Sequence, residues 1–334
     1  MDYLFISLQY LLQIFGYSFI YLAIACLIFY FLKIQDSKVK IFILILGLLK
    51  PFIVVIRLMD FKSNNIYNQF SYFSFINNQI SNLMNYNQLS KINFILINKL
   101  ILSFYIIAII IVTLFRFYQT YVNFHKFKKI GRVTESADYE INKIILNYSE
   151  IMKIRAPKIY FSEDLKNSFY VFGFIKKKII INKNIFYFLN KEEKETVLLH
   201  ELCHLKRHDN ILNAILIYLT DIHFYNPFSY IIYGIIKNEQ EKDCDKLAIK
   251  YSQKSNKEIA INILNSILKV KKIIFNEKIY CPNIASPFSD KVSIEEKTMR
   301  KRINTLLSFD PQKLNANIFT KIILYSFFLG LVLF

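Results

Sequence analysis

Four long apolar runs alternate with polar, lysine-containing segments along this chain. They lie near residues 8–32, 41–59, 100–117 and 318–334. Each run approaches or exceeds the roughly 20 residues that an α-helix needs to cross a hydrocarbon core of about 30 Å, and the last run is the shortest. The pattern predicts an α-helical integral membrane bundle of about four transmembrane helices.

Basic residues orient these predicted helices. The short loop after the first run carries Lys33, Lys38 and Lys40, whereas the longer loop at about 60–98 carries only Lys62 and Lys91. Cytoplasmic loops are enriched in lysine and arginine. We therefore expect a multi-pass protein of the cell membrane, with its N-terminus and the 60–98 loop external and the segment after the third helix cytoplasmic.

That cytoplasmic segment, residues 123–315, is long enough to fold as a domain between the three helices of residues 1–122 and the fourth helix of 316–334. Residues 158–162 read as a strand, and the β-rich runs 169–175 and 178–182 predict a hairpin. The hairpin could bind an extended peptide by edge pairing or have only a structural role. The apolar stretches 211–220 and 228–236 are too short to span a membrane and predict buried helices.

Charge and cysteine content narrow the function classes. The chain has 43 Lys and Arg against 25 Asp and Glu, a formal net charge of +18. These charges are dispersed and no nucleic-acid-binding motif accompanies them, so we expect no direct nucleic-acid contact and attribute the charge to attraction by an anionic lipid bilayer. The four cysteines show no paired spacing, and no disulfide framework is expected.

The sequence His-Glu-Leu-Cys-His at residues 200–204 carries the most specific chemistry. On a helix, the spacing of four residues lets His200 and His204 bind one Zn²⁺ ion, with Glu201 beside them as the general base. An amphipathic helix can also hold this pattern by accident. A second acidic segment, residues 239–245, supports the metal-site interpretation, and within it Glu241 is the expected third ligand.

Two aspartates are candidates to hold the rings of these histidines. Asp245 follows Glu241 by one helical turn and could accept the outer N–H of a histidine ligand, and Asp209 is the second candidate. His208 continues the histidine stripe, but eight helical residues rise about 12 Å, which one ion cannot bridge. Cys203 and Cys244 are interpreted as small buried thiols.

The order of these segments resembles the BlaR/MecR-type membrane zinc metallopeptidases, a family of antibiotic sensor-transducers and their relatives. The matching stretches are residues 167–174, 200–210, 221–227, 241–245 and 300–307. The resemblance implies a cytoplasmic zincin-like (gluzincin) α+β metallopeptidase domain packed against the membrane helices. It also implies Zn²⁺ bound by His200, His204 and Glu241, with Glu201 as the catalytic glutamate.

The resemblance further implies a function. The chain would be a zinc endopeptidase that hydrolyses peptide bonds on the cytoplasmic side in regulated signalling, by self-cleavage and by cleavage or release of a winged-helix transcriptional repressor. The sensor members carry a penicillin-binding domain after their last helix. This sequence ends at Phe334, so we expect no β-lactam binding of that kind. Lys176 to Lys178 stand where the family usually has a proline, which leaves substrate preference open.

Two alternatives remain at this point. A membrane quality-control protease of the Ste24 or HtpX type also joins this motif to a downstream glutamate, and a zinc-stabilised receptor or scaffold would need no catalysis. The intact Glu201 argues against the scaffold, because a structural site has no use for a general base. His223 or Tyr225 could stabilise an oxyanion or be structural. The sequence leaves open the signal, the substrate, the resting state and the oligomer, a homodimer included.

Overall fold

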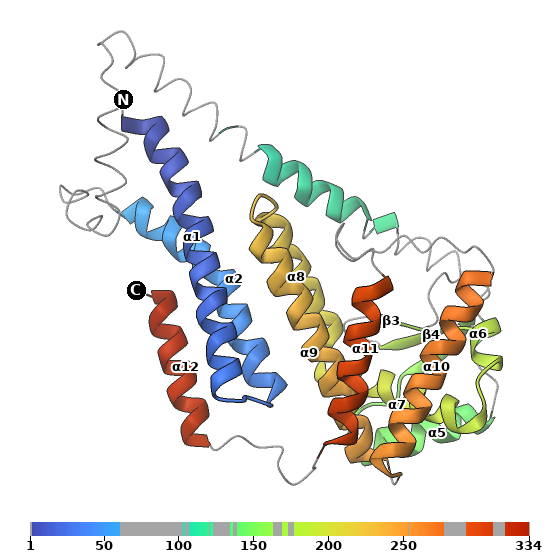
Figure 1. Cartoon of the computed structure of the whole chain (residues 1–334). Helices are drawn as coiled ribbons and strands as arrows, with labels where there is room; N and C mark the ends of the chain where they lie inside the picture. The colour runs from blue at the N-terminus through green and yellow to red at the C-terminus, as the bar shows by residue number, and fades with distance from the viewer. Residues whose placement is uncertain are drawn as a thin grey trace.

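Helices make up most of this protein, and one small sheet accompanies them (Figure 1). The computed structural model describes residues 2–60, 103, 107–119, 121–122, 134–135, 139–162, 169–172, 177–252, 254–276, 292–309 and 318–333. The helices are α1 Asp2–Phe31, α2 Ser37–Asp60, α5 Tyr139–Ile151, α6 Lys183–Tyr187, α7 Lys191–Arg207, α8 Asp209–Ile222, α9 Pro227–Tyr251, α10 Asn256–Asn276, α11 Val292–Leu307 and α12 Ile318–Leu333. Residues 107–119 are also helical.

The sheet has four strands in the order β1-β2-β4-β3. They are β1 Thr134–Glu135, β2 Lys158–Ser162, β3 Phe169–Phe172 and β4 Lys178–Asn182. β2 runs parallel to β4, and the β3–β4 pair is antiparallel with Phe169 opposite Ile181. The strand and the hairpin predicted from the sequence are confirmed, and β3 forms one edge of the sheet.

The largest core cluster joins the sheet to α5, α7 and α9. Ile179 and Ile181 of β4, Leu198 and Leu202 of α7, and Ala248 of α9 are all fully buried in it. Burying such aliphatic side chains contributes about 1.5–3 kcal/mol each. Buried and exposed residues do not alternate along β4, because both faces of this strand are covered. The same cluster places α7 between the sheet and α9.

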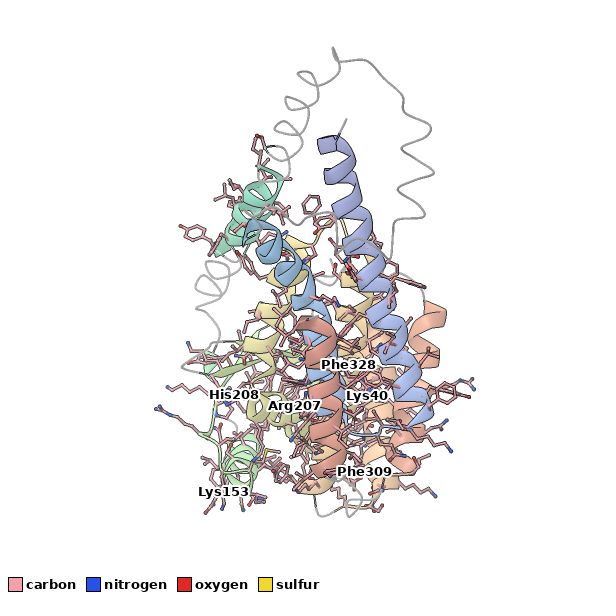
Figure 2. The ribbon with its side chains drawn as sticks, turned by 90° about the vertical axis from the view of Figure 1, so that its left-hand side faces the viewer. Lys40, Lys153, Arg207, His208, Phe309 and Phe328 are labelled. Carbon is pink, nitrogen blue, oxygen red and sulfur yellow. The ribbon has the colours of Figure 1, made fainter. Side chains whose placement is uncertain are left out.

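A second group of helices packs onto α8 and α9 from the other side, where α1, α2 and α12 lie together (Figure 1). Phe328 of α12 is fully buried against Tyr21 of α1, with ring centroids 5.5 Å apart (Figure 2). Leu44 of α2 packs in one cluster with Leu216 of α8 and Ile232 of α9. Helices predicted to form the membrane bundle therefore share a buried cluster with α8 and α9.

The predicted fold class, a bundle of about four transmembrane helices with a zincin-like α+β domain, is wrong. Among the described residues, no helix combines the length and apolar character that a membrane crossing requires. α12 has 16 residues, and α2 carries charged side chains at both ends and at Lys50. Some of the apolar side chains in these runs pack against other helices, as described above. Mean hydropathy does not distinguish such packing from contact with lipid.

Some predictions fall outside the described part of the chain. Residues 61–98 of the loop, and residues 100–102 and 104–106 of the third apolar run, lie outside the described residues. The boundaries at 122/123 and 315/316 stay predictions. The two short apolar stretches predicted as buried helices do lie in helices, α8 and α9.

Candidate metal centre

The histidine pair lies on α7, a helix whose two ends are well defined. Asn190 caps the N-terminus: its side chain accepts a hydrogen bond from the Glu193 N–H, and the Glu193 carboxylate accepts one from the Asn190 N–H. Such a capping box satisfies two N–H groups that a helix start otherwise leaves without partners. At the C-terminus, Lys177 Nζ donates to the Leu205 carbonyl at 2.8 Å. A cation there also complements the helix dipole.

The acidic segment lies on α9, which is tied to the N-terminal helices. Asn226 accepts from the Phe228 N–H and caps α9, and Pro227 occupies the first turn, where its missing N–H costs nothing. The Asn226 amide also donates to Ser18 Oγ of α1 at 2.9 Å. Further along, Ser37 Oγ of α2 donates to Glu239 at 3.0 Å. These contacts fix the position of α9 at its N-terminal end and at its middle.

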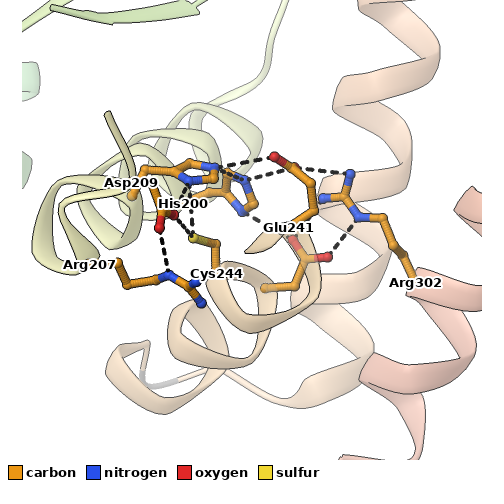
Figure 3. A network of polar contacts seen from close by, with 8 residues as sticks. His200, Arg207, Asp209, Glu241, Cys244 and Arg302 are labelled. Atoms are coloured by element: carbon orange, nitrogen blue, oxygen red, sulfur yellow. Dashed lines mark hydrogen bonds and ion pairs between the residues drawn. The ribbon is translucent and has the colours of Figure 1, made fainter. Parts of the chain in front are cut away.

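Three side chains from α7 and α9 converge on one point, as Figure 3 shows. The Nε2 atoms of His200 and His204 lie 3.1 Å apart. Each lies 3.5 Å from one oxygen of the Glu241 carboxylate. The structure therefore brings together the three residues that the sequence predicted as ligands.

The other nitrogen of each ring faces an aspartate. His204 Nδ1 lies 2.8 Å from Asp209 Oδ2, and His200 Nδ1 lies 3.0 Å from Asp245 Oδ1. The second contact has the distance of an ion pair but not the angle of a good hydrogen bond. Carboxylates in this position fix the tautomer and orientation of metal-binding histidines. Asp209 therefore lies where that role requires, and Asp245 lies close enough to His200 to take it.

The donor set fits a divalent metal ion. One atom from each of His200, His204 and Glu241 lies within 4.8 Å of the other two. Two imidazoles and one carboxylate are a ligand set of catalytic zinc sites, which keep a fourth position for water. Both Nε2 atoms face the shared point and both Nδ1 atoms face carboxylates, which is the ring orientation that metal binding needs.

Glu201 lies on α7 beside this cluster. Burial raises the pKa of its carboxyl group above the usual range, and the nearby histidine charges only partly offset that effect. Among the described residues, no hydrogen bond engages this carboxylate. A carboxylate with a raised pKa is suited to accept a proton near neutral pH.

The electrostatics of the cluster follow from its charge pairs. Burial lowers the pKa of His200, but the carboxylates of Asp245 and Glu241 outweigh this and raise it to about 10. Burial raises the pKa of Glu241, but His200, His204 and Arg302 together hold it well below its usual range. Without a metal, the site thus holds a protonated His200 between ionised carboxylates.

Three side chains at the site were not predicted to take part in it. Arg302 of α11 pairs with both Asp245 and Glu241. Arg207 donates to Asp209 at 3.1 Å and also pairs with Asp243. Arg302 belongs to the stretch 300–307 that carries part of the family resemblance, but only tertiary packing brings its side chain to the site.

The third is Cys244, which is buried as predicted, with its Sγ 3.2 Å from His204 Nδ1. Burial raises the pKa of this thiol well above its usual value. The group therefore stays a neutral thiol against the ring of His204. Cys203 is likewise fully buried, as expected.

His208, His223 and Tyr225 lie outside the cluster of His200, His204 and Glu241. His208 ends α7 and is exposed, with Nδ1 3.2 Å from Lys177 Nζ (Figure 2). His223 is buried beyond the far end of α8, with its Nδ1 2.7 Å from the Leu219 carbonyl. Glu241 lies about 21 Å further along α9 than Pro227, so neither His223 nor Tyr225 reaches the cluster. The structural interpretation of these two residues holds.

Comparison with known proteins gives a consistent family. Residues 19–294 match the sequence profile of the BlaR1 peptidase M56 family. The methicillin resistance mecR1 protein of Staphylococcus aureus is 35% identical over 92 residues, which is 28% of this chain and 16% of that protein. The regulatory protein BlaR1 of Bacillus licheniformis is 29% identical over 185 residues, 54% of this chain and 29% of that protein.

The regulatory protein BlaR1 of Staphylococcus aureus matches a longer stretch. It is 24% identical over 298 residues, 84% of this chain and 49% of that protein. The chain spans less than half the length of each of these relatives. Because the family profile covers most of the chain, including α7 and α9, this protein belongs to the BlaR1 peptidase M56 family.

Proposed function

We propose that this protein is a zinc endopeptidase whose metal is held by His200, His204 and Glu241. The observation that carries the proposal is the convergence of three ligand atoms, one from each residue, within 4.8 Å of one another. The position of Glu201 beside them supports catalysis over a structural zinc site. When bound there, zinc would acidify a water molecule and polarise the scissile carbonyl.

Glu201 performs the proton transfers in this proposal. Its carboxylate accepts the proton of the attacking water and delivers it to the nitrogen of the leaving amine, so that one peptide bond is replaced by an acid and an amine. The raised pKa of Glu201 supports both halves of this role. Asp245 and Asp209 hold the two imidazole rings while the proton moves.

The sheet edge supplies a place for the substrate backbone. β3 pairs with β4 on one side, and within the described residues nothing pairs with its other side. β3 also lies next to α7, the helix with the histidines. An extended peptide can add to such an edge through main-chain hydrogen bonds. Because these bonds do not involve side chains, they favour a protein substrate and place few demands on its sequence.

The pathway in this proposal is regulated signalling. Relatives of this chain are named for regulation and for methicillin resistance. The proposed substrates are the chain itself and a cytoplasmic winged-helix transcriptional repressor, which is cut or released when a signal arrives. The oligomeric state is left open.

The proposed location is the cell membrane, with the peptidase site on the cytoplasmic side. Large apolar side chains are exposed on α1, on residues 107–119 and on α12, for example Phe31 at 73%, Phe117 at 68% and Ile318 at 75%. Many large apolar side chains exposed on the same helices favour contact with lipid or another protein. Fractionation of cells with salt and carbonate washes tests this location: recovery of the chain in the washed supernatant contradicts it.

The catalytic part is tested with Glu201→Gln. The full-length wild type, Glu201→Gln and the matched control Glu192→Gln, an exposed position on the same helix, are purified and their zinc content and self-cleavage are measured. We expect equal zinc in all three, and cleavage only in the wild type and the control. Cleavage that persists in Glu201→Gln contradicts the proposal.

The repressor is tested separately. A winged-helix repressor encoded near this protein is incubated with the same three preparations, and its fragments are identified by mass spectrometry. Fragments that depend on Glu201 support the signalling role. Broad cleavage of unrelated misfolded proteins instead would favour a quality-control protease.

A further inference from the structure

Arg302 of α11 contacts two carboxylates of α9 at once (Figure 3). Its Nε donates to Asp245 Oδ2 at 2.8 Å and its Nη2 donates to Asp245 Oδ1 at 2.9 Å. Its Nη1 lies 3.3 Å from Glu241 Oε2. Because Glu241 and Asp245 are one turn apart on the same face of α9, one planar guanidinium can reach both, which a lysine ammonium cannot do in the same geometry.

Each of the two carboxylates also faces a histidine of α7. Asp245 Oδ1, which accepts from Arg302, lies 3.0 Å from His200 Nδ1. Glu241 Oε2, which faces Arg302, lies 3.5 Å from His200 Nε2. Arg302 is thus one contact away from both nitrogens of the same imidazole ring, although none of its contacts is with that ring.

Burial makes these contacts consequential. The Asp245 side chain is only 1% exposed and that of Arg302 is 15% exposed. A buried carboxylate without a cation is costly, so its position depends on the pairing. If Arg302 were removed, the remaining charged partner of the Asp245 carboxylate would be His200. The carboxylate would then no longer be held in a position independent of the His200 ring.

The guanidinium is held in place by the packing of its own helix. Leu306, one turn after Arg302, is 1% exposed and packs with Ile249 of α9 and with Ile259 and Ile263 of α10. Asn256 of α10 donates to the Phe309 carbonyl just beyond α11 at 2.6 Å. Arg302 is therefore set on a rigid support, as a residue that orients others must be.

We propose that Arg302 is a positioning residue of the metal site, which fixes Glu241 directly and His200 through Asp245. This inference rests on the proposed function, because it assumes that these residues hold a metal ion. It makes α11 a third element of the site beside α7 and α9. A merely structural ion pair would hold α11 on α9 without affecting how the metal is bound.

The experiment measures metal binding in the full-length protein, with Co²⁺ as a coloured probe. Dissociation constants come from competition with a chelator, and the visible absorption spectrum reports the ligand geometry. The variants are Arg302→Gln, Arg302→Lys, Asp245→Asn, the double variant Arg302→Gln/Asp245→Asn, and the control Arg300→Gln on the exposed part of the same helix.

We expect Arg302→Gln to weaken Co²⁺ binding by about 10- to 100-fold, the range typical for residues that support metal ligands, and to change the spectrum. Arg302→Lys should recover part of the affinity. The double variant should lose less binding free energy for Co²⁺ than the sum of the losses in the two single variants, because both substitutions act through Asp245. Arg300→Gln should leave affinity and spectrum unchanged.

Wild-type affinity and spectrum in Arg302→Gln overturn the inference. If that variant does not fold, Arg302→Lys decides instead: affinity and spectrum equal to those of Arg300→Gln overturn it. A wild-type chain that takes up no Co²⁺ overturns both this inference and the proposed function. Uptake by the wild type with Glu201-dependent cleavage, but with no effect of Arg302, overturns this inference alone.

Discussion

Asp209 contacts the ring of His204 only because the helix is broken between them. In one continuous helix, residues five positions apart point in directions about 140° apart and are offset by about 7.5 Å along the axis. Here α7 ends at Arg207, His208 follows with a left-handed φ of 59°, and α8 begins at Asp209. The turn brings Asp209 Oδ2 to 2.8 Å from His204 Nδ1.

Asp209→Asn should therefore weaken metal binding. The change keeps the size of the side chain but removes the charge that orients the ring of His204, and losses at such positions are about 10- to 100-fold in metal affinity. Chelator competition measures the constant. Asp221→Asn, which removes the partner of Arg116 at the far end of α8, is the control and should leave metal affinity unchanged. Equal constants for both variants contradict the prediction.

The turn itself can be tested at His208. A residue with a branched β-carbon is strained at positive φ, whereas glycine adopts it freely. We expect His208→Val to lower the free energy of unfolding by about 1–2 kcal/mol relative to His208→Gly. Both variants lose the contact with Lys177, so their difference isolates the backbone. Denaturant unfolding of the two proteins measures it, and equal midpoints would show that the turn is not strained.

The pairs within each helix, His200 with His204 and Glu241 with Asp245, could be predicted from sequence because their spacing is local, whereas the choice of Glu241 as third ligand depended on the acidic segment and on the family resemblance. A spacing of four residues on a helix fixes the relative position of the histidines, and Asp245 follows Glu241 by the same spacing. The contribution of Arg302 could not be predicted in this way. It lies 57 residues from Asp245 in the chain, and tertiary packing, including that of Leu306, brings its helix to α9.

The predicted membrane spans failed for a related reason. Apolar runs such as 41–59 indicate that side chains leave water, but they do not indicate what covers them. In the structure, Leu44 of α2 lies in one buried cluster with Leu216 of α8, and periodicity does not encode such packing between distant segments. The strands of the hairpin could be predicted because short runs rich in β-branched and aromatic residues, separated by basic residues, are local signals.

Stability should depend on pH through His223. This side chain is 3% exposed, and burial lowers its pKa below the ordinary value of 6.5. Below about pH 6.5 the unfolded chain takes up a proton that the folded protein does not bind. The contribution of His223 is thus fully present above that pH and is lost as the pH falls toward the lower pKa of the folded state, at up to about 1.4 kcal/mol per pH unit.

The measurement compares wild type and His223→Asn by denaturant unfolding between about pH 5 and pH 7.5. Groups that titrate in both proteins cancel in the difference. We expect the difference in stability to shrink as the pH falls, because asparagine does not titrate. A difference that stays constant with pH would mean that His223 is protonated in the folded protein as easily as in the unfolded chain.

Removal of the metal should destabilise the protein and depend on the ligand residues. A ligand at 100 times its dissociation constant stabilises the folded state by about 2.7 kcal/mol. We therefore expect a chelator to lower the melting temperature of the wild type and of Glu201→Gln, since both proteins keep all three proposed metal ligands. Glu241→Gln should melt at the same temperature with and without zinc, because it removes the carboxylate that lies 3.5 Å from both histidine nitrogens. Differential scanning fluorimetry with zinc, with chelator and with zinc restored measures these melting temperatures. A zinc-dependent change in melting temperature that survives in Glu241→Gln would place the metal elsewhere in the chain.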